Sequence, residues 1–287
     1  MKRLFSTLII YIGIFAVANA VSPMKMRFHC ENDTLKINNL LEAGLNSNIS
    51  YSNELMVYYA KQFLDIPYIA HTLEGDTEML TINIDELDCT TYVETVYALA
   101  RTTLSQRTTW RDFANNLESV RYRNGEMTDY ASRLHYISDW IMNNSARGNI
   151  KEITTEFGGC KYIIKTIDFM SKHREYYPAM ADSTIYEKIR NYEIGYRSHR
   201  FPYIKKELLY TKNVINEFES GDIIAMVTKT EGLDISHLGL VLKENNKLYF
   251  INASMGGKKV QIEKSQFADY MKNNRNCIGV RVFRIIP

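Results

Sequence analysis

The sequence predicts an α+β protein, in which helices come first along the chain and an antiparallel sheet follows. Two patterns support this class. Apolar residues in the first half recur at spacings of three and four, as on a helix face buried against a core. Short apolar runs in the last third are separated by Gly and Asn residues that favour turns. Helices followed by an antiparallel sheet are typical of α+β proteins.

Length and charge set the broad organisation. The 287 residues are enough to bury a large core. We expect a single domain over residues 21–287, with a helical lobe at about 50–150 and a sheet lobe at about 215–287. The formal net charge of +2 gives no indication of nucleic-acid binding.

Residues 1–20 have the pattern of a secretory signal peptide. Two basic residues precede the apolar run 4–18, and the Ala-Asn-Ala at 18–20 is a small-x-small cleavage site. An N-terminal membrane anchor is the alternative, but the run is short for a bilayer span. We therefore expect an exported protein, periplasmic or extracellular, with no stable membrane insertion after cleavage.

Four helices are expected in the first half. One follows the possible cap Ser52 and is closed by Pro67, and a second follows Asp88. The other two cover residues 110–120 and about 130–147. In the last of these, His135 and Asp139 are four residues apart and so share a face. Such a pair can orient a substrate or bind a metal, but a structural hydrogen bond is at least as good an interpretation, and no third ligand is near.

The rest of the chain turns gradually to strands. The centre is expected to contain a strand at 162–170, a helix at 184–196 and an ordered loop at 196–203. Arg and Tyr side chains of that loop can hold a glycan or peptide, although a solvated surface is the simpler interpretation. The strands of the C-terminal sheet are expected at residues 222–228, 235–242, 247–254 and 279–285.

Cys89 is placed at the start of the helix that follows Asp88. Unpaired amides and the positive end of the helix dipole stabilise an anion there, so the position favours a thiolate and a developing oxyanion. The alternative is a small buried hydrophobic residue, the commoner fate of a free cysteine. The four cysteines allow two disulfides, or one if Cys89 is a working thiol, and none has the C-x-x-C spacing of a zinc site.

His237 and Asn252 are brought together by the expected hairpin. If the hairpin turns on Asn245-Asn246, Glu244 faces Lys247, and Gly239 faces Asn252. His237 and Asn252 then lie on one face as diagonal neighbours, over a gap left by the missing side chain of Gly239. A lone histidine is more often a satisfied core residue. Cysteine, histidine and amide in this arrangement are, however, the nucleophile, base and orienting group of a cysteine hydrolase.

The order of motifs resembles the papain-like NlpC-type cell-wall hydrolases. The segments that carry the resemblance are Pro67-Tyr68, residues 88–94 (Asp-Cys-Thr-Thr-Tyr-Val-Glu), 221–224 (Gly-Asp-Ile-Ile), 236–240 (Ser-His-Leu-Gly-Leu) and 252–254 (Asn-Ala-Ser). Residues 133–140 and 232–237 further resemble the N-acetylmuramoyl-L-alanine amidase-like branch of that superfamily. Two departures are visible. Asn252 stands where histidine is frequent, and His71 stands where glycine is common.

This resemblance implies a papain-like core and a peptidoglycan amidase. The enzyme would cleave the amide between N-acetylmuramic acid and L-alanine, with preference for small 1,6-anhydro-muropeptides. Its catalytic residues would be Cys89, His237 and Asn252, and it would need no metal or organic cofactor. The substrate-binding candidates are Tyr68, which is placed to hold the oxyanion, and His135, Asp234 and Ser236.

Three other functions stay open at this point. The same triad can serve a γ-D-glutamyl endopeptidase of the stem peptide. The groove can instead belong to a catalytically silent muropeptide-binding protein, although the intact triad argues against this. A cysteine acyltransferase is a weaker possibility. The oligomeric state is not indicated by the sequence.

Overall fold

The computed structural model describes residues 25–287, so the expected signal peptide at 1–20 lies outside the described residues. The helices are α1 (Asp33–Asn46), α2 (Ser52–Gln62), α3 (Cys89–Leu104), α4 (Trp110–Arg121), α5 (Ile137–Ala146), α6 (Phe169–Lys172), α7 (Ser183–Ile194), α8 (Lys212–Glu217) and α9 (Phe267–Asn273). The strands are β1 (Met26–Phe28), β2 (Leu80–Ile82), β3 (Ile150–Glu152), β4 (Lys161–Lys165), β5 (His199–Lys205), β6 (Ile223–Thr228), β7 (Ile235–Glu244), β8 (Lys247–Ser254), β9 (Lys259–Ile262) and β10 (Cys277–Ile285).

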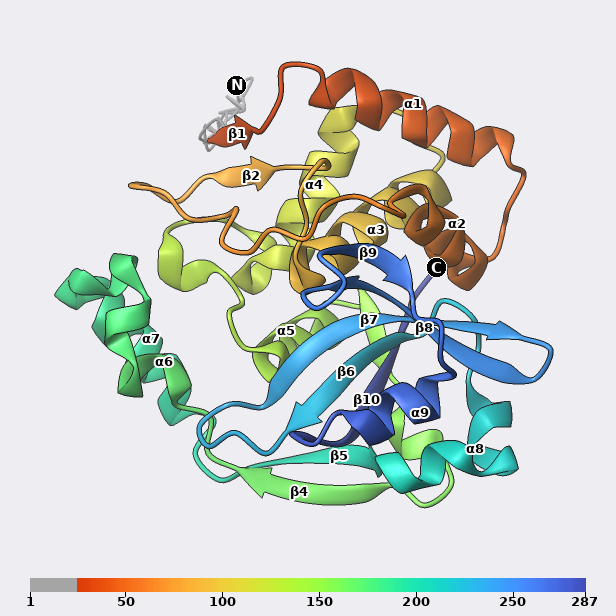
Figure 1. The fold of residues 1–287 in the computed structure, drawn as a ribbon. Coiled ribbons are helices and arrows are strands. Elements are labelled where there is room, and N and C mark those ends of the chain that lie inside the picture. Colours follow the sequence, from red (N-terminus) through yellow and green to blue (C-terminus); the bar gives the residue numbers. More distant parts are fainter. Residues whose placement is uncertain (1–24) are drawn as a thin grey trace, which may run out of the picture.

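An eight-stranded sheet forms the framework of the protein (Figure 1). Its strand order is β4-β5-β10-β6-β7-β8-β9, with β3 paired to β10, and the pairings are antiparallel. A separate parallel pair, β1 and β2, lies among the N-terminal helices. The expected α+β class is confirmed.

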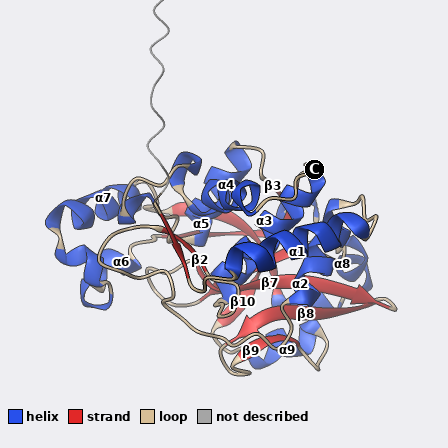
Figure 2. Cartoon of the chain, turned by 90° about the horizontal axis from the view of Figure 1, so that it is seen from above, coloured by secondary structure: helices blue, strands red, loops and turns tan. Residues whose placement is uncertain are grey.

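Helices cover both faces of the sheet. Helices α1 to α4 lie over one face, and one large apolar cluster joins them to residues such as Leu238, Leu240 and Ile251 (Figure 1). Helices α8 and α9 close the other face through a second cluster that includes Val241 and Phe250. Seen from above, α6 and α7 extend to one side of the sheet (Figure 2).

Helix α3 lies at the centre of the helical layer. All residues from 91 to 100 are buried, so the helix is enclosed on every side rather than along one stripe. One charged pair is enclosed with it. Arg121 Nε donates to Glu94 Oε2 over 2.6 Å, and the Arg121 guanidinium also donates to the Thr81 carbonyl over 2.8 Å. The pair therefore joins α3, α4 and β2 through Arg121. Removing either charge would leave the other buried without a partner, which costs about 3 to 5 kcal/mol.

The expected hairpin of β7 and β8 is confirmed. The two strands pair from Glu244 with Lys247 to Leu240 with Ile251. Asn245 and Asn246 both have positive φ angles, 51° and 60°, as a two-residue hairpin turn requires. The gap expected beside Gly239 is filled, however. A Cβ on Gly239 would lie 2.5 Å from Cζ of Phe250, so glycine is needed there to admit the phenyl ring.

The structure corrects several other expectations about secondary structure. The expected helix at 130–147 is broken into a 3-10 turn at Tyr130–Ser132 and helix α5, because Asp129 caps the turn and Arg133 is extended. Ser52 is the first residue of α2 and makes no capping hydrogen bond. Residues 199–203 of the expected loop at 196–203 belong to strand β5, which pairs with β4 on one side and β10 on the other. The expected strand at 162–170 ends with β4 and is followed by α6.

Candidate active site

Cys89 is the first residue of α3, as the sequence predicts. The Asp88 side chain accepts hydrogen bonds from the backbone N–H groups of Thr90 (3.0 Å) and Thr91 (2.8 Å). The Thr91 hydroxyl in turn accepts from the Asp88 backbone N–H over 2.9 Å. This reciprocal cap sets the start of the helix. It places Cys89, a half-buried residue, at the N-terminal end of α3.

The surroundings of the Cys89 thiol favour its neutral form. Burial, and then the charge of Asp88, raise the pKa of Cys89 to about 12. The backbone amides of Leu238 and of Cys89 itself lie near the sulfur and oppose this shift of the pKa. The sequence-based expectation of a stabilised thiolate is therefore wrong for the resting protein, because the dipole and amides of the helix start do not compensate the loss of water. The contact with Leu238 places the sulfur beside the residue that follows His237.

His237 is held by the side chain of Asn252. Its Nε2 lies 2.9 Å from Asn252 Oδ1, and the edge of the Phe250 ring packs against the imidazole. Burial lowers the pKa of His237, while Asn252 and the charges of Glu263 and Asp88 oppose that shift. Because a carbonyl oxygen only accepts, Nε2 carries the proton and Nδ1 keeps a lone pair. The imidazole is thus a neutral base with Nδ1 free to take a proton.

No hydrogen bond joins the thiol and the imidazole among residues 25–287. The side-chain neighbour of Cys89 Sγ is the Thr90 hydroxyl, 4.0 Å away. Hydrogen bonds between catalytic groups are often long before substrate binds. Helix α3, which begins at Cys89, packs directly on β7 and β8, the strands that carry His237 and Asn252.

Tyr68 lies on the thiol side of the same site. Its backbone N–H donates to the Lys258 carbonyl over 2.9 Å, and it forms a parallel bridge with Leu87, two residues before Cys89. Burial, and then the charges of Cys89 and Asp88, raise the pKa of Tyr68 to about 12. The hydroxyl therefore stays protonated and can donate a hydrogen bond near the sulfur.

His71, three residues after Tyr68, shows why glycine suits that position. Its φ angle is 64°, in the left-handed region that glycine adopts freely. A residue with a Cβ pays about 1 to 2 kcal/mol for that conformation. Histidine in place of the glycine that is common at this position therefore strains the backbone locally and does not change the fold.

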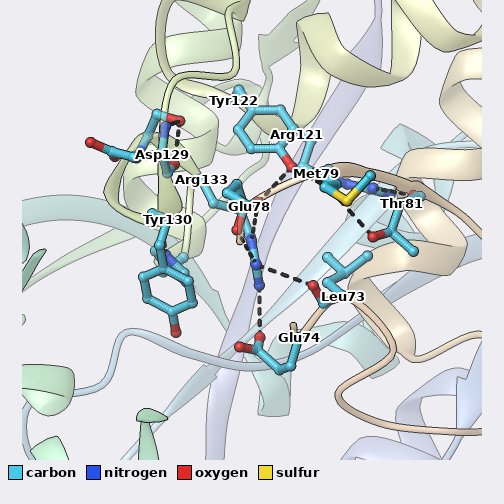
Figure 3. Close-up of polar contacts among 12 residues, drawn as sticks. Leu73, Glu74, Glu78, Met79, Thr81, Arg121, Tyr122, Asp129, Tyr130 and Arg133 are labelled. Atoms are coloured by element: carbon cyan, nitrogen blue, oxygen red, sulfur yellow. Dashed lines mark hydrogen bonds and ion pairs between the residues drawn. The ribbon is translucent and has the colours of Figure 1, made fainter. Parts of the chain in front are cut away.

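The loop between Tyr68 and β2 is anchored by Arg133 (Figure 3). The guanidinium donates to both carboxylate oxygens of Glu78, over 3.0 and 2.6 Å, and to Glu74 over 2.8 Å. The Tyr122 hydroxyl donates to Glu78 over 2.6 Å. Arg133 and Glu78 are largely buried, so this pairing restrains the loop far more than a surface ion pair would.

His135 does not reach Asp139. Its Nε2 donates to the Tyr130 carbonyl over 2.8 Å, and its ring packs on the Tyr130 ring with centroids 4.5 Å apart. Asp139 is paired with Arg123 and accepts from the Tyr196 hydroxyl over 2.7 Å. The shared helical face expected from the sequence is wrong, because His135 precedes α5. Burial and the charge of Arg133 lower the pKa of His135 to about 3, so it has the contacts of a structural histidine.

The two other substrate-binding candidates lie in different surroundings. Asp234 is buried, and its Oδ2 accepts from the Ser138 backbone N–H over 2.5 Å at the start of α5. It faces away from solvent, which does not suit a group that holds substrate. Ser236 is exposed at a bulge, where the pairing of β6 with β7 shifts between Met226 and Val227. It lies next to His237 and is open to a ligand.

Sequence reasoning missed two residues of this site. Glu263 follows β9 and accepts from Asn252 Nδ2 over 2.9 Å. Tyr270 of α9 packs its ring against Phe250 and lies near both Glu263 and Cys89, whose charges add to burial in raising its pKa. Predicting a strand at 259–262 would have identified Glu263. Asn252 pairs with Gln261, so Glu263, two residues further along, lies on the same face of the sheet. A cavity of about 600 Å³ beside β9 also has Glu263 in its wall.

The described residues that are close enough together to bind a metal ion lie away from Cys89 and His237. Among residues 25–287, one group of three could bind a cation, namely His29, Cys30 and Asp85. Lys36 Nζ already contacts both oxygens of Asp85, at 2.8 and 2.6 Å. All four cysteines are free, so the structure does not support the disulfide that the sequence allowed. None of the helices in the described part is long and apolar enough to span a bilayer.

The site as a whole has the composition of a nucleophilic hydrolase: a thiol at a helix start, a neutral imidazole beside it and an amide that holds the imidazole. The chain belongs to the AmiA-like family, described as N-acetylmuramoyl-L-alanine amidase-like, whose model matches residues 58–280. The amidase-like branch that the sequence resembled is therefore confirmed. No curated protein matches this chain.

Solved structures agree with this family. An N-acetylmuramoyl-L-alanine amidase from Bacteroides uniformis is 36% identical with a TM-score of 0.78, covering 82% of this chain and 99% of its own. A protein from Bacteroides fragilis, described as a putative xylanase, is also 36% identical with a TM-score of 0.75, covering 79% of this chain and 99% of its own. A Legionella pneumophila protein at 22% identity and a TM-score of 0.67 covers 88% of this chain and 95% of its own, and shares the fold.

Proposed function

We propose that this protein hydrolyses the amide between N-acetylmuramic acid and L-alanine of muropeptides, with Cys89, His237 and Asn252 as its catalytic residues. The observation that carries the proposal is the hydrogen bond between His237 and Asn252, on two strands that pack against α3, the helix that begins at Cys89. The name of the Bacteroides uniformis relative supports the choice of bond. The preference for small 1,6-anhydro-muropeptides and the membership in the papain-like NlpC superfamily rest on the sequence resemblance.

The first half of the reaction follows from the neutral thiol and imidazole. As Cys89 Sγ attacks the amide carbon, its proton passes to Nδ1 of His237. The carbonyl oxygen becomes an oxyanion, for which the Cys89 backbone N–H and the Tyr68 hydroxyl are donors. The C–N bond then breaks, and His237 returns the proton to the departing L-alanine nitrogen. A thioester between Cys89 and the lactyl group remains.

The second half regenerates the enzyme. His237 takes a proton from water as the water oxygen attacks the thioester carbon. The C–S bond breaks, the sulfur recovers its proton, and the lactyl carboxylic acid leaves. Every step uses groups of this chain and water. Export by the segment 1–20, and a single domain over 21–287, complete the proposal.

Mass spectrometry of defined muropeptides before and after incubation tests the function. Disaccharide plus free peptide is the expected product pair. A shortened stem peptide would instead make the protein a γ-D-glutamyl endopeptidase, and unchanged substrate would make it a binding protein. Cys160→Ser is the matched control for Cys89→Ser, because Cys160 is also partly exposed but lies just before β4. Equal loss of activity in both variants would contradict the assignment of Cys89.

A further inference from the structure

Glu263 is the neighbour of Asn252 on the side away from His237. Its Oε1 accepts from Asn252 Nδ2 over 2.9 Å and from Gln261 Nε2 over 3.0 Å. Its backbone N–H donates to the Phe250 carbonyl over 2.8 Å, which fixes the residue against β8. Asn252 is fully buried, so each end of its amide has one protein partner and no access to solvent.

This arrangement decides which way the Asn252 amide points. A carboxylate can only accept hydrogen bonds, so the NH₂ end of the amide must face Glu263. The carbonyl end must then face His237, where it can only accept. Nε2 of His237 therefore holds the proton, and Nδ1 holds the lone pair. If the amide were reversed, its NH₂ group would favour the opposite tautomer, with the proton on Nδ1.

We propose that Glu263 is a positioning residue, which fixes the base-competent tautomer of His237 through the orientation of Asn252. The consequence for catalysis rests on the proposed function, whereas the tautomer itself does not. A histidine protonated on Nδ1 cannot accept a proton there from Cys89. Orientation of the amide is thus as necessary as the amide itself.

Glu263 also acts on His237 by its charge, and this second effect can be separated from the first. The groups that face the imidazole are Asn252 from β8, Glu263 from the end of β9 and Asp88 from the start of α3, together with the Phe250 ring. Glu263→Gln removes the charge but keeps an oxygen that accepts from Asn252. Glu263→Met keeps the length of the side chain and removes the acceptor.

The test is the tautomer of His237 measured by long-range ¹H–¹⁵N NMR on protein labelled at histidine, with the signal assigned by its loss in His237→Gln. We expect the Nε2–H form in the wild type and in Glu263→Gln, and a mixture or the Nδ1–H form in Glu263→Met. On muropeptide, Glu263→Met should lower kcat at least about tenfold with little change in KM. Glu263→Gln should keep most of kcat and move the acid limb of the rate to lower pH, since losing the anion disfavours the imidazolium.

Two outcomes would overturn the proposal. One is an Nδ1–H tautomer in the wild type, which needs no variant and no activity. The other is a folded Glu263→Met protein with an unchanged tautomer and kcat. Glu244→Met is the control, because Glu244 lies at the far end of the hairpin and pairs only loosely with Lys61, at 3.8 Å. If the wild type hydrolyses no muropeptide, the proposed function fails while the NMR result still decides the role of Glu263.

Discussion

His237 and His135 are two partly buried histidines with similar physical properties and different neighbours. Burial lowers the pKa of both, and each uses Nε2 for its hydrogen bond. His135 donates to a backbone carbonyl, which the chain itself holds in place. His237 donates to the side-chain amide of Asn252, which Glu263 contacts in turn, and the residue after His237, Leu238, lies near the Cys89 thiol. A lowered pKa alone therefore does not mark a functional histidine.

The polar groups around the two histidines also differ in whether they are paired with one another. His135 lies among groups that pair with one another, such as Arg133 with Glu78 and Arg123 with Asp139. Among the described residues, Nδ1 of His237 and the Tyr68 hydroxyl near Cys89 make no hydrogen bond, so both keep capacity that a substrate can use. An unused donor or acceptor near a candidate nucleophile is therefore a better sign of a functional site than a shifted pKa.

Cys89→Ser should give the largest effect, a loss of hydrolysis of at least about 10³-fold, because a serine hydroxyl beside this neutral imidazole is a much poorer nucleophile. The fold should be kept, since one oxygen replaces one sulfur. Steady-state rates on a defined muropeptide and a thermal melt check both parts. Near-wild-type turnover would show that Cys89 is not the nucleophile. His237 would then have no role as its base and would not differ in function from His135.

Asn252 should come next. Asn252→Ala should slow the reaction by about 10- to 100-fold without abolishing it, because His237 still meets the thiol for part of the time. Asn252→His should keep substantial activity, since an imidazole offers a comparable partner atom. Kinetics of the two variants on one substrate are the measurement. Wild-type activity in Asn252→Ala would show that orientation of His237 does not depend on this amide.

The hairpin with His237 could be predicted from the sequence and the segment around His135 could not, because local patterns fix the first and contacts distant in sequence fix the second. The hairpin that carries His237 is fixed by a two-residue Asn-Asn turn and by alternation along two neighbouring strands, so short-range patterns suffice. The segment around His135 is fixed by contacts distant in sequence, such as Arg133 with Glu74 and Glu78. Helical periodicity continues through 130–147, and nothing local shows that these contacts hold Arg133 extended.

The residues of the candidate site could be predicted where local sequence patterns fix the elements that carry them. Cys89, His237 and Asn252 lie on elements with strong local signals, a capped helix and a tight hairpin. Glu263 was not found because β9 is short and follows a turn in which Lys258 has a φ of 58°. The resemblance to the family predicts Asp234 as a ligand-binding residue, and its hydrogen bond with Ser138 depends on where α5 packs, which no local pattern indicates.

The pH dependence sharpens the contrast between a working base and a structural histidine. His237 must be neutral to accept the thiol proton, and its pKa lies below the ordinary value of 6.5. The acid limb of kcat/KM should therefore have its midpoint below 6.5, with the rate falling as the pH decreases through it. Cys89 should give no alkaline limb near neutrality, because its pKa is raised to about 12. Alkylation of Cys89 by iodoacetamide should rise steadily with pH. A plateau extending below pH 6 would instead show a preformed thiolate and imidazolium.

His135→Gln should have the smallest effect on activity, within about threefold, because the Gln amide can donate to the Tyr130 carbonyl in place of Nε2 and no thiol is near. Its effect should fall on stability and should depend on pH. His135 has a pKa of about 3 in the folded protein and an ordinary value of 6.5 when unfolded. The unfolded chain therefore binds the proton first, so the contribution of His135 is complete above pH 6.5 and is lost as the pH falls below it.

Urea unfolding of the wild type and His135→Gln at pH 7.5 and 5.5 measures this dependence. The loss of ring packing should make the variant less stable by about 1 to 2 kcal/mol at pH 7.5. The difference should shrink by about 1 kcal/mol at pH 5.5, because glutamine does not titrate. A loss of activity greater than tenfold at unchanged stability would show that His135 contacts the substrate, as the sequence resemblance implies. The two histidines would then belong to one extended site, and the hydrogen bond to Tyr130 would serve to aim the imidazole at its ligand.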